Sequence, residues 1–430
     1  MRRIAPLRST RRQFLRTMAG TALAAPLVIP ASALGAAGRP PASERIVVAH
    51  IGMGWFGTVD LKTFLQSDEA QNVAVCDVDS TKASAAKELV DARYGNRDCK
   101  TYHDFREMLD RDDIDAVSIA TPDHWHAIPT IEACRRGKDV HVEKPLSLTI
   151  REGRAMVEAA RRYGRVVQTG SEARSQACCR FACELVRNGR IGEVREVYAS
   201  CGGPSSMEIL PAQPVPPDLD WEMWLGPAPW RPYNKAYHPV SWRGYYDFSG
   251  GGLTDWGAHH FDLAQWALGM DASGPVQIIP PDGKEHKLLT FVYANGVRMY
   301  HVLGGKPDVE MLSAVTIIGT KGRVGLRYGA LDKTDPPSLM KEVIGSSELH
   351  LHRCPPGGHE CGDFLTSVRN RSRPGADVEI GHRSICVSHL AHIAYRLRRP
   401  LRWDPVKEEF PGDEEANRQC ARAMREPWRL

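Results

Sequence analysis

The chain has 430 residues, enough for about two or three domains, and its 42% hydrophobic content is that of a packed globular protein. The formal net charge is +4, but residues 1–33 contain six arginines and no acidic residue, so the rest of the chain carries −2. A body so close to neutral excludes a global nucleic-acid-binding surface, and we expect no nucleic-acid partner.

Residues 1–35 are typical of a twin-arginine signal peptide. The sequence Thr-Arg-Arg-Gln-Phe-Leu-Arg at residues 10–16 precedes a moderately apolar stretch at 18–29, and Ala-Ser-Ala at 31–33 offers a cleavage site. The apolar stretch is short for a bilayer span and contains a glycine and a proline, so an uncleaved anchor is the weaker alternative. We expect the twin-arginine export machinery as a partner and the periplasm as the location.

A dinucleotide-binding fingerprint follows this segment. Residues 45–51 are an apolar run, Gly52, Gly54 and Gly57 come directly after it, and a second apolar run ends at Asp77. The glycines permit a tight turn and let backbone amides approach a pyrophosphate, while the acidic side chain would bind a ribose diol. The turn predicted to bind NAD comprises Gly52, Met53, Gly54, Trp55, Phe56 and Gly57.

Residues 45–168 alternate short apolar strands with amphipathic helices. Strand candidates at 115–120, 139–142 and 165–168 continue the pattern that begins with the fingerprint. Strands separated by helical segments predict an α/β unit with a doubly wound parallel sheet.

Residues 169–430 have a different pattern. Turns such as Asn-Gly at 295–296 join strand candidates, which predicts an open, mostly antiparallel sheet in an α+β domain. Late helices are predicted as well. The strands are expected at 194–200, 288–294, 297–303 and 314–318, and the helices at 382–397 and 413–424.

Residues 202–252 form a long loop rich in proline and tryptophan. In one interpretation, Trp221, Trp224, Trp230 and Trp242 cement contacts between domains or subunits. In the other they form an aromatic wall, because flat apolar faces stack on the C–H groups of sugar rings. Both interpretations can hold together.

The eleven cysteines show no regular spacing, and most are expected to be buried small hydrophobic residues. Cys354 and Cys361, together with His350 and His352, make a metal site conceivable. No Cys-x-x-Cys pair fixes the ligand geometry, so we predict no metal site.

The first polar cluster after the fingerprint is Glu143-Lys144-Pro145. It comes directly after the strand predicted at 139–142, and therefore lies at the carboxyl edge of the parallel sheet, where ligands of such sheets bind. A lysine there could meet the nicotinamide end of the cofactor. The alternative is a surface ion pair with a turn proline.

The second polar cluster follows three consecutive glycines at 250–252. Asp255, His259 and Asp262 are spaced i, i+4 and i+7, which predicts that they share one face of a helix and line a cavity. The alternative is a structural histidine with satisfied hydrogen bonds.

Together with Ala-Thr-Pro-Asp-His-Trp-His at 120–126, these motifs resemble, in this order, the Gfo/Idh/MocA family, whose namesakes include glucose–fructose oxidoreductase and inositol dehydrogenase. The likeness runs from about residue 45 to residue 430, and the sequences at 381–383, 401–404 and 425–428 resemble an exported subgroup. The resemblance implies an N-terminal Rossmann domain at 45–168, a C-terminal substrate domain at 169–430 and a sugar or polyol bound between them.

By position, the resemblance implies that Lys144 and His259 are catalytic. His259 would accept the proton of a substrate hydroxyl while hydride leaves the same carbon, and Asp255 would fix the imidazole or bind a neighbouring hydroxyl. Lys144 would stabilise the developing alkoxide charge. The implied cofactor contacts are Asp77, Thr121, Pro122, His126, Glu143, Lys144 and, in a Trp-Arg pair, Arg243.

The cofactor is expected to be NAD rather than NADP. Asp77 and Asp79 present two carboxylates where a 2′-phosphate would lie, although Lys82 leaves NADP open. Glucose–fructose oxidoreductase has a tyrosine at the position of His259, so the arrangement resembles inositol dehydrogenase more closely.

Export constrains the expected reaction. Twin-arginine substrates fold before export and the periplasm has no ordinary pool of free dinucleotide, so we expect tightly bound NAD. Three functions stay open: an oxidoreductase acting on a hydroxyl of a sugar, polyol or glycoside, a redox-neutral glycosidase or epimerase that uses bound NAD transiently, and a non-catalytic binding protein. We also expect a homo-oligomer.

Overall fold

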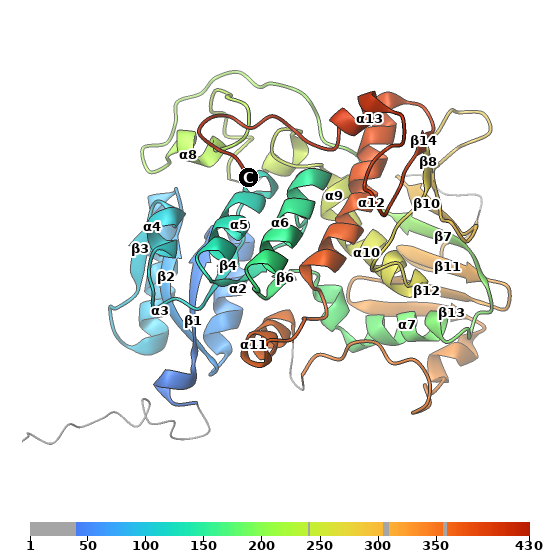
Figure 1. Cartoon of the computed structure of the whole chain (residues 1–430), viewed down its shortest axis with the longest axis horizontal. Helices are drawn as coiled ribbons and strands as arrows, with labels where there is room; N and C mark the ends of the chain where they lie inside the picture. The colour runs from blue at the N-terminus through green and yellow to red at the C-terminus, as the bar shows by residue number, and fades with distance from the viewer. Residues whose placement is uncertain (1–39, 240, 304–308, 356–358) are drawn as a thin grey trace, which may run out of the picture. The chain divides into compact units, whose positions relative to one another are not determined.

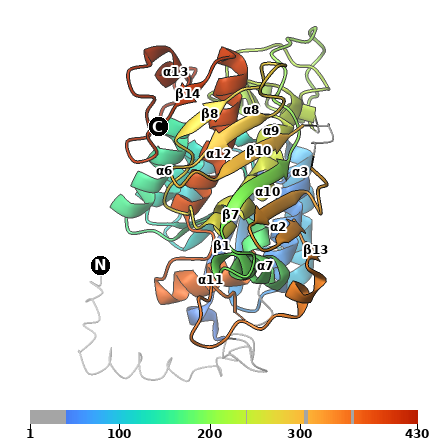
Figure 2. The same cartoon turned by 90° about the vertical axis from the view of Figure 1, so that its right-hand side faces the viewer.

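The structure is a computed structural model that describes residues 40–239, 241–303, 309–355 and 359–430. Ile46–Leu430 forms one compact unit, and Met1–Arg45 forms a separate one that contains the short 3₁₀ helix η2 (Ala42–Glu44). The signal peptide predicted at 1–35 lies outside the described residues. Figures 1 and 2 show the larger unit from two directions.

The first sheet of this unit has six strands in the order β3-β2-β1-β4-β5-β6, and all its pairs are parallel (Figure 1). Strand order runs in opposite directions from β1 and β4, so right-handed crossovers place the helices on both faces of the sheet. This confirms the predicted doubly wound sheet. The strands are β1 (Ile46–Ile51), β2 (Ala70–Cys76), β3 (Lys100–Tyr102), β4 (Ala116–Ile119), β5 (Asp139–Val142) and β6 (Val167–Thr169), and the helices are α2 (Trp55–Gln66), α3 (Ser80–Tyr94), α4 (Phe105–Leu109), α5 (Ala127–Arg135) and α6 (Ile150–Arg162).

Side chains fix where two of these helices begin. The Asp79 carboxylate accepts hydrogen bonds from two amides in the first turn of α3. At α6, Thr149 and Glu152 form a capping box: Thr149 Oγ1 accepts from the Glu152 amide at 3.2 Å, and the Glu152 carboxylate accepts from the Thr149 amide at 2.9 Å. The segment between β5 and α6, which contains Lys144, is therefore anchored at both ends.

The second sheet has eight strands in the order β13-β12-β11-β7-β10-β9-β8-β14. Its pairs are antiparallel except for β7 with β10, which confirms the mostly antiparallel sheet. The strands are β7 (Val194–Ser200), β8 (Gln277–Ile279), β9 (Leu289–Val292), β10 (Arg298–Val302), β11 (Val315–Gly319), β12 (Arg323–Arg327), β13 (Ala330–Asp335) and β14 (Leu401–Arg402).

Three helices pack on this second sheet, and Figure 2 shows them behind its strands. Leu185, Phe261 and Leu390, one from each helix, are fully buried in a single apolar core with side chains of the sheet. The three are α7 (Ala177–Arg187), α10 (Gly257–Leu268) and α12 (Val378–Leu397), and the remaining helices are α8 (Trp221–Leu225), α9 (Gly252–Asp255), α11 (Glu360–Asn370) and α13 (Glu414–Arg418).

The two late helices differ from their predicted bounds. Helix α12 begins at Val378 rather than at residue 382 because the Asp377 carboxylate caps it by accepting from the Glu379 amide at 3.1 Å. Helix α13 ends at Arg418 rather than at residue 424. The chain beyond it packs along the first half of the unit, where the Trp428 ring contacts the ring of Trp125 at a centroid distance of 4.7 Å.

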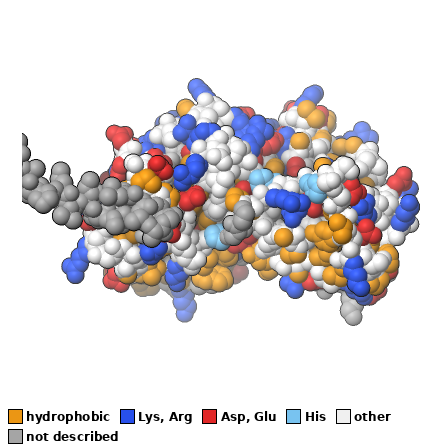
Figure 3. Space-filling model, turned by 90° about the horizontal axis from the view of Figure 1, so that it is seen from below, with side chains coloured by type: hydrophobic (Ala, Val, Ile, Leu, Met, Phe, Trp, Pro, Cys, Tyr) orange, Lys and Arg blue, Asp and Glu red, His pale blue; other side chains and the backbone are white. Residues whose placement is uncertain are grey.

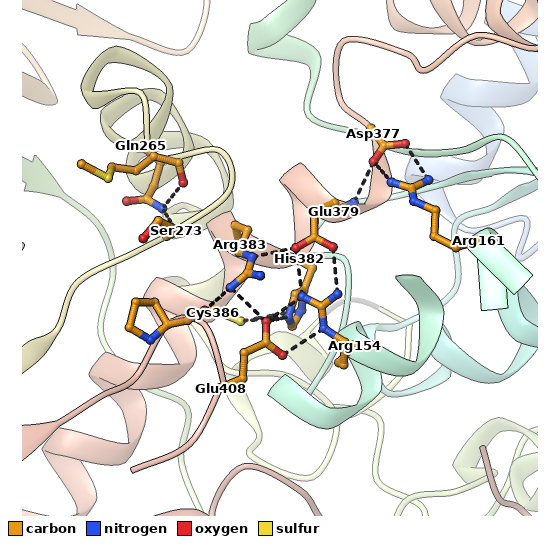
Figure 4. Close-up of polar contacts among 12 residues, drawn as sticks. Arg154, Arg161, Gln265, Ser273, Asp377, Glu379, His382, Arg383, Cys386 and Glu408 are labelled. Carbon is orange, nitrogen blue, oxygen red and sulfur yellow. Dashed lines mark hydrogen bonds and ion pairs between the residues drawn. The ribbon is translucent and has the colours of Figure 1, made fainter. Parts of the chain in front are cut away.

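Charged side chains join α6 to α12 (Figure 4). Arg154 on α6 donates to both Glu379 oxygens at 2.8 and 2.9 Å and to both Glu408 oxygens at 3.0 and 2.6 Å. On α12, Arg383 donates to Glu379 at 2.7 Å, and His382 Nε2 lies 2.7 Å from Glu408 Oε1. We call these five residues the α6–α12 network. It connects the half of the unit with the parallel sheet to the half with the antiparallel sheet.

The surface carries charges of both signs. On the face in Figure 3, lysine and arginine are interspersed with aspartate and glutamate, and hydrophobic side chains gather on the half with the second sheet. Of the described helices, none combines the length and hydropathy that a membrane span requires. Several large hydrophobic side chains are exposed, among them Trp55, Trp230 and Trp256.

We expect Arg154→Met to lower the free energy of unfolding by about 2 kcal/mol at neutral pH, because Glu408 loses its Arg154 contact in a buried position while Arg383 still pairs with it. Burial would raise the pKa of Glu379, but hydrogen bonds from Arg154 and Arg383 outweigh it and lower the pKa to about 2. The network therefore stabilises the fold above the ordinary glutamate pKa and loses this effect as pH falls toward 2.

Urea unfolding at about pH 7 and about pH 4 would measure both effects. The difference between wild type and Arg154→Met should be smaller at the lower pH. Arg195→Met is the matched control, because its ion pair with Glu193 is exposed at 65% and 75% and should contribute less than about 0.5 kcal/mol. Equal stability of the wild type and Arg154→Met would contradict the role of the network.

Candidate active site

A cavity lies at the carboxyl edge of the first sheet, beside the point where strand order reverses between β1 and β4. In doubly wound sheets this is where ligands bind. The cavity is lined by most of the predicted site residues, namely Gly52, Gly54, Trp55, Phe56, Asp77, Thr121, Pro122, Glu143, Lys144 and Arg243, whereas Met53, Gly57, His126, Asp255 and His259 lie outside its lining.

The glycine turn has the shape that a pyrophosphate requires. Gly52 has a φ of +86°, and a Cβ there would lie 2.8 Å from the Ala120 carbonyl oxygen; a Cβ on Gly57 would lie 1.8 Å from the Gly52 carbonyl oxygen. At Gly54, in contrast, a Cβ would have no described atom beyond its chain neighbours within 4 Å. Gly54 immediately precedes α2, so this open space faces the amide-rich start of a helix, where anions bind.

Asp77 ties the end of β2 to the glycine turn. Its Oδ2 accepts from the Met53 amide at 2.6 Å and its Oδ1 accepts from the Asp79 amide at 2.8 Å. Burial raises the pKa of Asp77, although these hydrogen bonds and the charge of Lys82 act against the rise. Each oxygen keeps a free lone pair, so the carboxylate can still accept from ribose hydroxyls. These residues fit a dinucleotide.

Thr121 lines the cavity, whereas His126 supports the wall of the cavity from behind. The Thr121 hydroxyl is buried next to the cavity and has no hydrogen-bond partner among the residues that the structure describes, so it is free to bind a ligand there. His126 lies behind the cavity, where its ring nitrogens are 2.8 Å from the carbonyl oxygens of Thr121 and Pro145. It therefore holds two cavity segments together.

Lys144, which follows β5, contacts Asp255, the last residue of α9. Lys144 Nζ donates to Asp255 Oδ1 at 2.7 Å, and Arg243 Nε lies 3.4 Å from the same oxygen. Burial would raise the pKa of Asp255, but the charges and hydrogen bond of its neighbours, chiefly Lys144, outweigh burial and lower the pKa. Arg243 also stacks on Trp242, 4.3 Å from the ring centre. The site thus holds a carboxylate between two cations.

His259 lies beside this pair without a hydrogen bond to Asp255 in the described residues. Its Nδ1 is buried without a partner, and its ring packs against those of Tyr328 at 4.8 Å and Trp256 at 5.8 Å. Burial, with a further contribution from the Lys144 charge, lowers the pKa of His259 to about 3. The imidazole is therefore neutral at physiological pH, and its Nδ1 has no hydrogen-bond partner among the described residues.

The predicted single helical face is wrong in two respects. A one-residue interruption at Trp256 separates Asp255, the last residue of α9, from His259 of α10, and the Asp255 carboxylate pairs with Lys144. Asp262 is fully buried away from the cavity, where it accepts from Arg174 at 2.8 Å and from Ser384 at 2.5 Å. Asp262 satisfies a buried arginine and does not line the site.

Three polar residues near the site were not predicted. Burial raises the pKa of Asp123, which lines the cavity, to about 7 and so leaves it partly protonated at neutral pH. The Tyr328 hydroxyl, next to His259, donates to Glu172. Glu172 follows β6 closely, so the carboxyl edge of a parallel strand could have indicated it, but nothing local marks Tyr328.

The tryptophans of the loop at 202–252 divide between the two interpretations. Trp221 is buried and stacks on Trp224 at 4.7 Å within an aromatic cluster, which is a packing role. Trp224 and Trp242 also line the cavity, whereas Trp230 is 63% exposed.

The cavity, its glycine turn and its acid at the end of β2 define a dinucleotide-binding enzyme fold. Two models of one family match the chain: the NAD-binding Rossmann fold of an oxidoreductase family at residues 46–171 and the C-terminal alpha/beta domain of the same family at 204–430. The chain belongs to the Gfo/Idh/MocA oxidoreductase family.

The proteins that are similar to this chain match it over different shares of its length. Myo-inositol 2-dehydrogenase of Thermotoga maritima is 26% identical, with 84% of this chain and 99% of the relative covered. A glycosyl hydrolase family 109 protein of Shewanella sp. strain ANA-3 is 31% identical over 43% of this chain and 44% of its own. The WlbA dehydrogenase of Bordetella pertussis, solved with NADH and UDP-GlcNAcA, shares the fold with a TM-score of 0.58 at 19% identity, over 84% of this chain and 100% of that one.

We expect Gly54→Ala to raise the dissociation constant of NAD about tenfold, because the new methyl group would occupy the space through which the pyrophosphate approaches the start of α2. Calorimetry after removal of any bound dinucleotide measures the constant. The melting temperature should not change, since the methyl group would meet no described atom. Gly274→Ala is the matched control, equally open but distant from the cavity lining. Unchanged NAD affinity in Gly54→Ala would mean that the cofactor does not approach this turn.

Proposed function

We propose that this protein oxidises a hydroxyl-bearing carbon of a sugar, polyol or glycoside, with residues 45–168 binding NAD and residues 169–430 binding the substrate. The observation that carries the proposal is the Lys144–Asp255 contact beside a neutral His259, all at the edge of the cavity that fits a dinucleotide. The names of the relatives support the substrate class, because one acts on a polyol and another was solved with a sugar nucleotide.

The chain supplies the cofactor site and the proton chemistry. The glycine turn would hold the pyrophosphate, Asp77 a ribose, and Thr121 and Glu143 the cofactor's inner end. Bound NAD supplies the hydride acceptor. Of the two carboxylates expected near the ribose, Asp77 lines the cavity, whereas Asp79 caps α3. The expected preference for NAD over NADP therefore depends on Asp77.

His259 is placed to take the hydroxyl proton. A neutral imidazole with a free ring nitrogen can accept a proton from a substrate hydroxyl, and the nearby Asp255 carboxylate would stabilise the imidazolium that forms. Lys144 can donate to the same substrate oxygen and stabilise its negative charge while hydride leaves the carbon. In the reverse direction the same groups return the proton.

We expect His259→Asn and Lys144→Met each to lower turnover by about a hundredfold or more, because each removes a group that handles the substrate proton or its charge. The assay follows reduced nicotinamide by absorbance, with a panel of sugars and polyols that begins with myo-inositol. His259→Asn should still bind NAD, since His259 does not line the cavity.

His260→Asn is the matched control for this prediction. His260 is the next residue of α10, but its Nδ1 lies 2.5 Å from the Ser200 carbonyl oxygen and it takes no part in the site. Its turnover should stay within about threefold of wild type. Turnover near the wild-type value in both His259→Asn and Lys144→Met would remove the proposed site.

A redox-neutral reaction is the second candidate function, because several relatives that are similar to this chain are named as glycosyl hydrolase family 109 proteins. Transient oxidation of a hydroxyl acidifies the neighbouring C–H group, which permits elimination or epimerisation and then return of the hydride. Export to the periplasm, which we also propose, favours this candidate because an exported enzyme cannot exchange NAD freely. A homo-oligomer stays a prediction.

The mature protein is expected to retain its dinucleotide through purification. Mass spectrometry and absorbance of the supernatant after denaturation should give about one equivalent of NAD or NADH per chain. Stoichiometric dinucleotide would favour paired-sugar or redox-neutral turnover, whereas an empty protein that reduces added NAD with a sugar would favour an ordinary dehydrogenase and contradict tight binding.

A further inference from the structure

A second cluster of polar side chains lies behind the cavity, between β5, α2 and α11. His141 lies on β5, and Glu143 follows directly after the last residue of this strand. Asp60 of α2 faces them, as do Glu360 and Cys361 from the first turn of α11. We call these five residues the β5–α11 cluster.

The spacing within the β5–α11 cluster is close to that of metal ligands. The ligand atoms of His141, Glu360 and Cys361 all lie within 4.8 Å of one another, and so do those of Asp60, Glu143 and Glu360. His141 Nε2 is 3.9 Å from Glu360 Oε1. Ligand atoms around a tetrahedral zinc ion lie about 3.3–3.8 Å apart, so a small rotation of side chains would complete the geometry. Glu360 belongs to both groups and is the shared member.

Each carboxylate of this cluster has one oxygen without a partner. Asp60, Glu143 and Glu360 are 4–6% exposed, and one oxygen of each has no hydrogen-bond donor among the described residues. Buried polar atoms are normally paired, and three neighbouring carboxylates without a cation repel one another in a medium of low dielectric constant. In the described residues Lys144 directs its ammonium to Asp255 rather than to these oxygens.

His141 provides an independent observation. Its side chain is fully buried, and neither Nδ1 nor Nε2 has a hydrogen-bond partner in the part of the chain that the structure describes. The rings of Phe64 and Phe364 contact the imidazole edge to face at 5.8 and 5.9 Å and hold it toward Glu360. An imidazole with two unused nitrogens inside a protein lacks a ligand that would satisfy it.

We propose that the β5–α11 cluster binds one zinc ion through His141, Glu360 and Cys361, with the Asp60 and Glu143 carboxylates beside it. Nitrogen, oxygen and thiolate sulfur together are the donor set that zinc prefers among the common divalent ions. The ion would offset part of the negative charge of the buried carboxylates and connect β5 to α11. Because Glu143 immediately precedes Lys144, the zinc ion would also hold the strand end that carries the lysine.

This site was not predicted from the sequence: a site of Cys354 and Cys361 with His350 and His352 was conceivable, but no metal site was predicted. The structure separates the two cysteines: Cys354 lies with His352 and Asp363, and Cys361 lies with His141 and Glu360. His352 is 40% exposed and already pairs with Asp363 at 2.7 Å, so the group with Cys354 has less need of a metal.

Elemental analysis of the purified full-length protein tests the proposal. After dialysis against zinc and then against metal-free buffer, the wild type should retain about one equivalent of zinc per chain, and Glu360→Gln and His141→Gln less than about a tenth of one. His352→Asn, which alters the exposed group, is the matched control and should retain zinc as the wild type does. Wild type without zinc, or zinc lost only in His352→Asn, would overturn the proposal.

A second measurement does not depend on how the buried variants fold. Cobalt bound in place of zinc should give the near-ultraviolet absorbance of a thiolate-to-cobalt bond in the wild type, and Cys361→Ser, which changes one atom, should lack this band. The absence of the band in wild type, or its persistence in Cys361→Ser, would overturn Cys361 as a ligand. Neither readout requires turnover, so the result is independent of the proposed oxidoreductase activity.

Discussion

The α6–α12 network sets the geometry on which the candidate active site depends. Lys144 enters from the segment that leads into α6, whereas Asp255 comes from α9, which packs against α12. Arg154 joins the two helices through Glu379 and Glu408. A shift of about 1 Å between these halves would break the 2.7 Å contact of Lys144 with Asp255, and catalytic groups lose much of their effect with such a displacement.

Sequence patterns correctly predicted those strands and turns whose conformation is determined by residues close together in the sequence. The strand at 194–200 has the bounds of β7, and the glycine turn follows β1 as expected, because alternation and glycine spacing are properties of short segments. The last helix was predicted too long because its final residues have helical propensity, yet contacts of the distant Trp125 with Trp428 determine where the chain runs. Propensity is a weak guide where tertiary packing decides.

The contrast between local sequence patterns and tertiary packing also explains which features of the site could be predicted. Lys144 follows a parallel strand, so its place at the cavity was predictable from topology. Helical spacing placed His259 near Asp255, but no periodicity reports the one-residue interruption at Trp256 that divides them between α9 and α10. Tyr328 reaches Glu172 across 156 positions of sequence, a pairing that a single sequence does not encode in any local pattern.

The two proposals meet just after β5, where the adjacent residues Glu143 and Lys144 contact different neighbours. Lys144 turns to the cavity and to Asp255, while the unpartnered oxygen of Glu143 belongs to the β5–α11 cluster. A cation bound behind Glu143 would lower the cost of burying that carboxylate and leave the lysine charge for the substrate oxygen. A buried ion, and a dinucleotide held in a cavity within one compact unit, would both bind most readily while the chain folds.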